Sequence, residues 1–214
     1  MATKQDFAVL VAVKKLDIIP NRLKMEPDMR SEILSHLGEN LIVLVGMMAS
    51  GKTSVGKLLA QRIGIPFVDA DHEIETAAQM SVTEIFQQHG EAYFRNGERR
   101  VIERILKDGP RVLATGGGAY MNSETRKAIE ERGVSIWLKA DAETLLRRAR
   151  RRANRPLLQN GDPETVIKQL MDVRYPIYAH ADMTIESRDG PHDATVDDVI
   201  TALVNHIAQV GMQA

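Results

Sequence analysis

The sequence lacks several features that would point to particular protein classes. Its 214 residues include no cysteine, which excludes disulfides, thiolate metal sites and cysteine nucleophiles. Aromatic residues make up only 4%, and 28 basic residues are balanced by 29 acidic ones. Neither base stacking nor a net positive field therefore favours a nucleic-acid partner. No apolar run approaches the roughly 20 residues of a membrane span, so we expect a cytoplasmic protein without a membrane partner.

The most informative stretch is LIVLVGMMASGKTS, from Leu41 to Ser54. A five-residue apolar run, which predicts a buried strand, is followed by the spacing Gly-x-x-x-x-Gly-Lys-Thr of a phosphate-binding P-loop. Backbone N–H groups of such a loop surround nucleotide phosphates, and the N-terminus of the next helix adds positive charge. The loop residues predicted to bind nucleotide are Gly46, Ala49, Ser50, Gly51, Lys52, Thr53 and Ser54. Lys52 would reach the β- and γ-phosphates, and the Thr53 hydroxyl would bind Mg²⁺.

An acidic pair, Asp69 and Asp71, ends the second predicted strand, which begins at Ile65. Alternation along a strand would place both carboxylates on one face, at the edge where α/β sheets bind ligands. A cation and a substrate hydroxyl between them would offset their mutual repulsion. The alternative is that one aspartate only caps a helix starting near His72.

Arg95 and Glu98 are neighbours on one face of a predicted helix. An ordinary surface ion pair is one interpretation of this spacing. Because the pair follows the acidic residues, Arg95 could instead bind a substrate carboxylate through its planar guanidinium, with Glu98 fixing its orientation.

Three consecutive glycines, Gly116, Gly117 and Gly118, follow the predicted strand from Val112 to Thr115. Such a run costs backbone entropy, so we expect something to approach this backbone closely. The strand does not end in the aspartate that usually serves magnesium in P-loop ATPases. Magnesium is therefore assigned to Asp69 with Thr53, which favours a small-molecule kinase over a motor ATPase. Asp141 is the rival metal residue, although its place before a predicted helix favours an N-cap.

A dense run of arginines lies between Arg147 and Arg155. Nucleic-acid binding and a solvated helix face are two interpretations, and the near-neutral net charge argues against the first. Proline and glycine punctuate the residues after Arg155. This composition suits a mobile lid over about residues 148–163 that brings Arg155 onto the transferring phosphoryl group.

In their order and spacing, these motifs resemble the shikimate kinase family over roughly residues 40–210. The matching motifs are the P-loop, Asp69-x-Asp71, Gly90-Glu91-x-x-Phe94-Arg95-x-x-Glu98, the triple glycine, Arg155-Pro156-Leu157-Leu158 and Arg174-x-x-x-Tyr178. The resemblance implies a three-layer α/β/α P-loop kinase fold of the nucleoside monophosphate kinase type, with a central parallel five-stranded sheet and a mobile lid. It also implies transfer of the γ-phosphoryl group of ATP to the 3-hydroxyl of shikimate, on the route to chorismate and the aromatic amino acids.

The resemblance further implies roles for individual residues. Shikimate would be bound by Asp71, Arg95, Gly117 and Arg174, with Gly116 and Gly118 beside them. Arg148 would lie against the adenine and Arg155 would touch ATP, while Lys52, Asp71 and Arg155 would carry catalysis. ATP is then the co-substrate and Mg²⁺ the cofactor, and we expect a monomer. Residues 1–39 lie outside the resemblance and form an extension of unknown role, before a kinase domain over residues 40–210.

Two departures from the family pattern stand out. Ala49 occupies a P-loop position where the family usually has glycine, and after the last strand only Arg188 is a candidate for the basic residue on the adenine side. Two competing hypotheses remain at this stage. One is a kinase of the same fold acting on gluconate or a nucleotide, and the other is a non-catalytic nucleotide-binding module.

Overall fold

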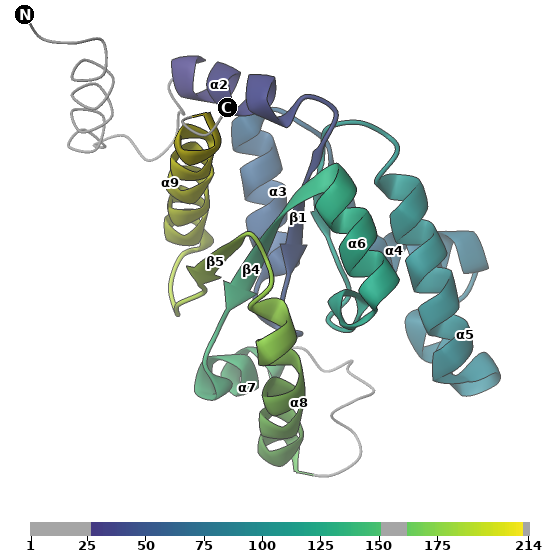
Figure 1. Ribbon diagram of the computed structural model, residues 1–214. Coiled ribbons are helices and arrows are strands. Elements are labelled where there is room, and N and C mark those ends of the chain that lie inside the picture. Colours follow the sequence, from purple (N-terminus) through teal and green to yellow (C-terminus); the bar gives the residue numbers. More distant parts are fainter. Residues whose placement is uncertain (1–26, 151–161, 212–214) are drawn as a thin grey trace, which may run out of the picture.

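The computed structural model describes residues 27–150 and 162–211 (Figure 1). The strands are β1 (Leu41–Val45), β2 (Phe67–Asp69), β3 (Val112–Ala114), β4 (Gly133–Lys139) and β5 (Met183–Glu186). The helices are α2 (Pro27–Leu37), α3 (Lys52–Ile63), α4 (Ala70–Ala78), α5 (Val82–Ile105), α6 (Ser123–Arg132), α7 (Ala142–Arg150), α8 (Pro163–Tyr178) and α9 (His192–Gly211), with a short 3₁₀ helix at Ala119–Met121. Arg155 and most of the predicted lid lie outside the described residues.

The five strands form one parallel sheet in the order β2-β3-β1-β4-β5. Alternate residues of β1 enter different cores: Leu41, Val43 and Val45 pack on one side of the sheet, and Ile42 and Leu44 on the other. A central strand buried on both faces explains why its sequence is continuously apolar. The predicted five-stranded parallel sheet is confirmed.

Helices cover both faces of this sheet, giving three layers (Figure 1). Helices α2, α3 and α9 share one hydrophobic core with the sheet, and α5, α6, α7 and α8 share the other. Because β1 has β3 on one side and β4 on the other, the chain leaves β1 at the point where the strand order reverses. Ligands of open α/β sheets bind at that crevice, beyond the carboxyl ends of the strands. The predicted three-layer fold is confirmed, and it places the P-loop there.

Part of the predicted N-terminal extension packs on the sheet domain. Helix α2 buries Ile33 and Leu37 in the same hydrophobic core as α3 and α9. The boundary proposed at residue 39 and the role of the extension stay predictions. Within the described ranges, no helix is both long and apolar enough to cross a membrane.

The prediction that both aspartates project from one strand is wrong. Strand β2 ends at Asp69, and helix α4 begins at Ala70, so Asp71 lies in the first helical turn. The cap of this helix is Asp69, whose carboxylate accepts a hydrogen bond from the backbone N–H of Asp71 at 3.1 Å. The helix therefore starts two residues before His72, because an aspartate at the strand end satisfies one of its first N–H groups.

Candidate active site

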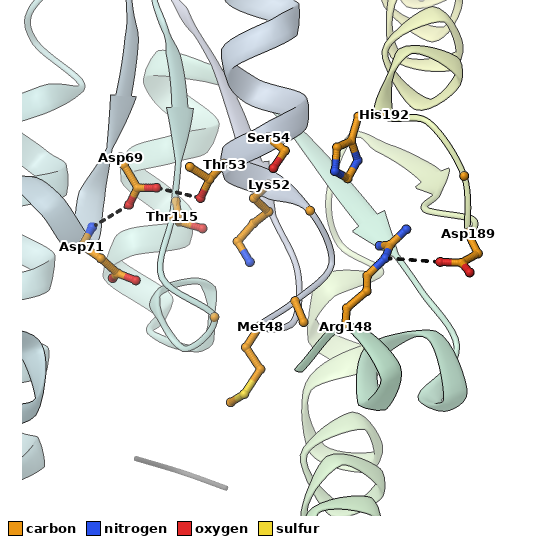
Figure 2. Close-up of a pocket in the computed structure, with 14 residues that line it drawn as sticks. Met48, Lys52, Thr53, Ser54, Asp69, Asp71, Thr115, Arg148, Asp189 and His192 are labelled. Carbon is orange, nitrogen blue, oxygen red and sulfur yellow. Dashed lines mark hydrogen bonds and ion pairs between the residues drawn. The ribbon is translucent and has the colours of Figure 1, made fainter. Parts of the chain in front are cut away.

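A cavity of ≈ 330 Å³ lies at the carboxyl edge of the sheet. Figure 2 shows Lys52 in its middle, the acidic pair on one side, and Arg148, His192 and Asp189 on the other. The residues that line it are Met48, Ala49, Gly51, Lys52, Thr53, Ser54, Asp69, Asp71, Thr115, Gly117, Arg148, Asp189, Gly190 and His192. Nine of the residues predicted to bind ligands thus lie in one wall, although they come from distant parts of the chain.

The P-loop needs left-handed backbone at three positions. Gly46 has φ 134° and Gly51 has φ 100°, which glycine adopts readily because it has no Cβ. A Cβ on Gly46 would lie 2.7 Å from the carbonyl oxygen of Leu138, so no larger residue fits. Ala49 also has a positive φ, of 64°, and there the side chain makes the conformation costly.

Helix α3 begins directly after this loop. Its N-cap, Gly51, supplies no side-chain hydrogen bond to the helix, so an anion could bind to the first N–H groups in place of a cap. The Lys52 ammonium is buried and donates to the carbonyl oxygens of Gly46 and Met47, both at 2.8 Å. These bonds hold the cation over the loop, beside the place where phosphate oxygens would sit.

The two residues assigned to magnesium are in contact. The Thr53 hydroxyl donates to Asp69 Oδ2 at 2.8 Å, and both residues line the cavity. In the parts of the chain that the structure describes, no group of three or more histidine and acidic side chains could enclose a metal ion by itself. One carboxylate and one hydroxyl nevertheless suit Mg²⁺, which usually takes its remaining ligands from water and substrate phosphates.

Arg95 and Glu98 form a buried ion pair on α5. Arg95 Nη1 lies 2.6 Å from Glu98 Oε2, and the Glu98 side chain is only 3% exposed. The interpretation of this pair as an ordinary surface contact is therefore wrong. A second carboxylate, that of the exposed Glu91, lies 3.3 Å from Arg95 Nη2, so Arg95 is held from two sides.

The triple glycine makes room for charged side chains of the protein itself. A Cβ on Gly116 would lie 2.5 Å from Glu98 Oε1 and 2.8 Å from Asp71 Oδ1. A Cβ on Gly118 would lie 2.5 Å from three atoms of the Arg95 guanidinium. Distances below about 3 Å are repulsive for carbon, so the glycines let this cluster assemble. The close approach predicted from the glycine run is confirmed.

Helix α8 adds Arg174 to the same cluster. The helix continues to Tyr178, so Arg174 and Tyr178 lie one turn apart on one face. Both side chains donate to the carbonyl oxygen of Gly117, Arg174 at 3.1 Å. Tyr178 belongs to the motif noted in the sequence, but its orienting contact with Gly117 was not predicted.

Burial shapes the electrostatics at this end of the cavity. It raises the pKa of Asp71 above its ordinary value, and the neighbouring Asp69 adds to the effect. It also raises the pKa of Glu98, although the positive charges of Arg95 and Arg174 oppose that rise. Two carboxylates and two guanidinium groups thus lie together in a partly buried site, where electrostatic interactions are stronger than in water.

The other end of the cavity is organised around Arg148 of α7. Its guanidinium donates to the hydroxyl of Ser187 at 2.9 Å and to the carbonyl oxygen of Arg188 at 2.6 Å. The side chain of Arg188, the predicted basic residue, is not part of the wall, whereas Asp189 and His192 are. The sequence analysis did not predict that Asp189 and His192 line the cavity. Both follow shortly after a strand, at the edge where α/β sheets bind ligands, and that position could have indicated them.

Asp141, the rival metal residue, caps a helix as we favoured. Its carboxylate accepts from the backbone N–H of Thr144 at 2.7 Å and from the Thr144 hydroxyl at 3.0 Å. The backbone hydrogen bond stabilises the charged form, and the pKa of Asp141 is accordingly lowered. This carboxylate is therefore committed to the start of α7.

The fold and the cavity together define a P-loop protein of the kinase type. A family model described as shikimate kinase matches residues 48–204. The shikimate kinase of Bradyrhizobium diazoefficiens is 55% identical over 185 residues, which cover 86% of this chain and 89% of the relative. The chain belongs to the shikimate kinase family.

Solved structures agree with this assignment. A shikimate kinase from Acinetobacter baumannii in complex with shikimate has a TM-score of 0.77 and 35% identity, covering 81% of this chain and 97% of the other. A gluconokinase from Sinorhizobium meliloti reaches a TM-score of 0.55 at 16% identity and covers 82% and 98%. That second likeness extends to the fold only, so it lends no support to gluconate as the substrate.

Proposed function

We propose that this chain transfers the γ-phosphoryl group of ATP to the 3-hydroxyl of shikimate, giving shikimate 3-phosphate and ADP, on the route to chorismate. Membership of the family supports both substrates. The observation that carries the proposal is the cluster of Asp71, Arg95, Glu98 and Arg174 around the triple glycine, which adjoins the P-loop cavity. A phosphate loop and a binding site for a hydroxylated acid lie side by side.

In this assignment the two arginines bind the substrate carboxylate. A guanidinium offers paired N–H donors to a carboxylate, and partial burial strengthens the interaction. Glu98 holds Arg95 in place at 2.6 Å. Asp71 would accept hydrogen bonds from the ring hydroxyls, and Gly116, Gly117 and Gly118 would lie against the ring.

Phosphoryl transfer requires alignment and charge neutralisation more than covalent help from the protein. The hydroxyl oxygen bonds to the γ-phosphorus as the bond to the bridging oxygen breaks. Asp71 orients this hydroxyl and accepts its proton. Lys52 moves from the loop carbonyls to the phosphate oxygens and offsets their developing charge. Arg155, from outside the described residues, is assigned to the same phosphoryl group.

Thr53 and Asp69 are the residues that would hold Mg²⁺. The bound ion would neutralise the β- and γ-phosphates and keep them in line. The hydroxyl oxygen of Thr53 and the carboxylate oxygen of Asp69 are already neighbours, at 2.8 Å. We expect Asp69→Asn to raise the Mg²⁺ concentration needed for half-maximal ADP binding, which calorimetry at varied Mg²⁺ would measure.

We further infer a cytoplasmic monomer that acts on small molecules and has neither a nucleic-acid nor a membrane partner. The near-neutral net charge of −1 supports this view. Light scattering at several protein concentrations tests the monomer, since a dimer would double the measured mass.

A coupled ADP-release assay tests the function. Turnover is expected with shikimate and ATP and not with gluconate or with ATP alone. Turnover with gluconate at a comparable kcat/KM would reject the substrate assignment. ADP binding without turnover of either acid would instead favour the non-catalytic module. Thermal shift with shikimate, with and without MgADP, provides a binding measurement that does not depend on turnover.

A further inference from the structure

The hydroxyl of Ser187 joins two segments at the end of the cavity that contains Arg148. Ser187 directly follows β5 and is 2% exposed. Its hydroxyl donates to the carbonyl oxygen of Ser50 in the P-loop at 2.7 Å and accepts from Arg148 Nη1 at 2.9 Å. One hydroxyl group can make both bonds, because it carries a donor and two acceptor lone pairs. This buried hydroxyl thus links the phosphate loop to Arg148 through two short hydrogen bonds.

The place of this hydroxyl is set by the sheet. The backbone N–H of Ser187 donates to the carbonyl oxygen of Lys139, at the end of β4. A Cβ on Gly51 would lie 3.7 Å from Ser187 Oγ and 3.8 Å from Arg148 Nη1. The connection therefore runs beside the residue at which the P-loop becomes a helix.

Arg148 has further partners that restrict its rotation. Its Nη2 donates to the carbonyl oxygen of Arg188 at 2.6 Å, and its Nε lies 3.9 Å from the Asp189 carboxylate (Figure 2). Nη1 also reaches the carbonyl oxygen of Ser50 at 3.3 Å. Ser187, Ser50 and Arg148 are therefore all in contact with one another. The two hydrogen bonds of the Ser187 hydroxyl are shorter than the direct contact between Arg148 and Ser50.

We propose that Ser187 is a positioning residue that sets the distance between the P-loop and the guanidinium of Arg148. This inference rests on the proposed function, since it takes the adenosine of the nucleotide to lie beside Arg148, as the family resemblance implies. Phosphates and nucleoside belong to one ligand, so both subsites must be correctly spaced to bind it well. An alanine at this position would leave a buried carbonyl and a guanidinium each short of one hydrogen bond. Arg148 would then move relative to the loop.

The experiment compares a ligand that uses both subsites with one that uses only the loop. The full chain and Ser187→Ala are titrated by calorimetry with ADP and with inorganic tripolyphosphate, both with Mg²⁺. Loss of one hydrogen bond to a charged group should weaken ADP binding about tenfold. Tripolyphosphate binding should change less than about twofold, because this ligand lacks the nucleoside that is assigned to Arg148.

A double-mutant cycle separates positioning from general damage. In an Arg148→Ala background, Ser187→Ala should weaken ADP binding by less than about twofold, since the group that it positions is gone. Equal weakening of ADP and tripolyphosphate, or fully additive effects of the two substitutions, overturns the proposal. If Ser187→Ala does not fold, Ser187→Cys fills the site with a weaker donor, and the ratio of ADP affinity to tripolyphosphate affinity is compared in the same way.

Ser135 provides the matched control. It is equally buried, at 2% exposed, and its hydroxyl donates to Asp182 Oδ2 at 2.6 Å and accepts from the Asp182 N–H at 3.0 Å. Ser135→Ala should lower thermal stability but leave the ADP to tripolyphosphate ratio unchanged; a shift of that ratio would overturn the proposal. All titrations measure binding without turnover. If the chain binds ADP but does not phosphorylate shikimate, the proposed function is rejected, and the effect of Ser187→Ala on binding can still be interpreted.

Discussion

Two parts of the cavity are built in different ways. The P-loop in its middle comes from one short loop and the helix after it, and it relies on backbone conformation at Gly46, Ala49 and Gly51. The end proposed to bind the acid, called the acid-binding end below, brings charged side chains from α4, α5 and α8 onto the glycine run after β3. The first depends on local φ and ψ, and the second on how distant elements pack.

This difference determines which substitutions each part tolerates. Backbone N–H groups keep their function under substitution as long as the loop keeps its shape. A buried charge cluster has no such tolerance, because removal of one partner leaves another charge without compensation. We therefore expect substitutions at the acid-binding end to act selectively on shikimate.

The largest effect is expected at Lys52, which lies in the P-loop part of the cavity, next to the acid-binding end. Lys52→Met keeps an unbranched side chain one heavy atom shorter and removes the charge that would move onto the phosphates. Loss of one preorganised electrostatic contact should lower kcat by about 10²–10³-fold. The coupled assay at saturating substrates measures it, and a loss smaller than about tenfold would contradict the assigned role.

Arg95→Lys and Arg174→Lys test the acid-binding end alone. Lysine keeps the charge but loses the planar pair of donors. The KM for shikimate should rise about 10–100-fold and the KM for ATP by less than about threefold. Arg99→Lys is the control, since Arg99 pairs with the surface residues Glu103 and Glu124. An equal rise of both KM values would reject the assignment.

Gly118→Ala tests whether the glycine run accommodates Arg95. The added Cβ would lie 2.5 Å from the guanidinium, so Arg95 must shift and the KM for shikimate should rise about tenfold. Gly97→Ala is the comparison, because a Cβ there meets nothing within 4 Å. It should raise stability by about 0.5–1 kcal/mol, as alanine favours the helix, and leave KM unchanged.

A pH-dependent difference in stability is expected for Glu98→Gln. Burial raises the pKa of Glu98 in the folded chain, so the folded state binds its proton more tightly than the unfolded state does. The contribution of Glu98 to stability is therefore fully present below its unfolded pKa and is lost as the pH rises through the folded pKa. The parent chain should lose stability relative to Glu98→Gln over that window. Urea unfolding of both chains from pH 4 to 8 tests the sign, and a relative gain by the parent would contradict it.

The smallest effect is expected at Ala49 in the phosphate loop. Its φ of 64° costs about 1–2 kcal/mol for a residue with a side chain. Ala49→Gly removes that cost but adds freedom to the unfolded chain, so a net gain of about 0.5–1 kcal/mol in unfolding free energy is expected. Chemical denaturation measures the gain, and both KM values should stay within about twofold.

Sequence reasoning was most successful where a function is carried by neighbouring residues. The P-loop, the helix cap at Asp141 and the Arg95–Glu98 pair each follow from spacing within a few positions. It was wrong about Asp71, because the change from strand to helix occurs at a single residue that periodicity cannot locate. It missed Ser187 and His192, since neither belongs to a motif.

By itself, the sequence determined a phosphate-binding loop after a buried strand, because that feature depends on local spacing. The order of its motifs along the chain carried the family resemblance, which implied a parallel sheet and a kinase for a small acid. Only the tertiary structure decided that the triple glycine accommodates Arg95, Glu98 and Asp71, and that Ser187 links the loop to Arg148. Those contacts join residues far apart in the chain, and their existence depends on the order of the strands and the packing of the helices. The spacing of residues along the sequence does not reveal which distant residues come into contact.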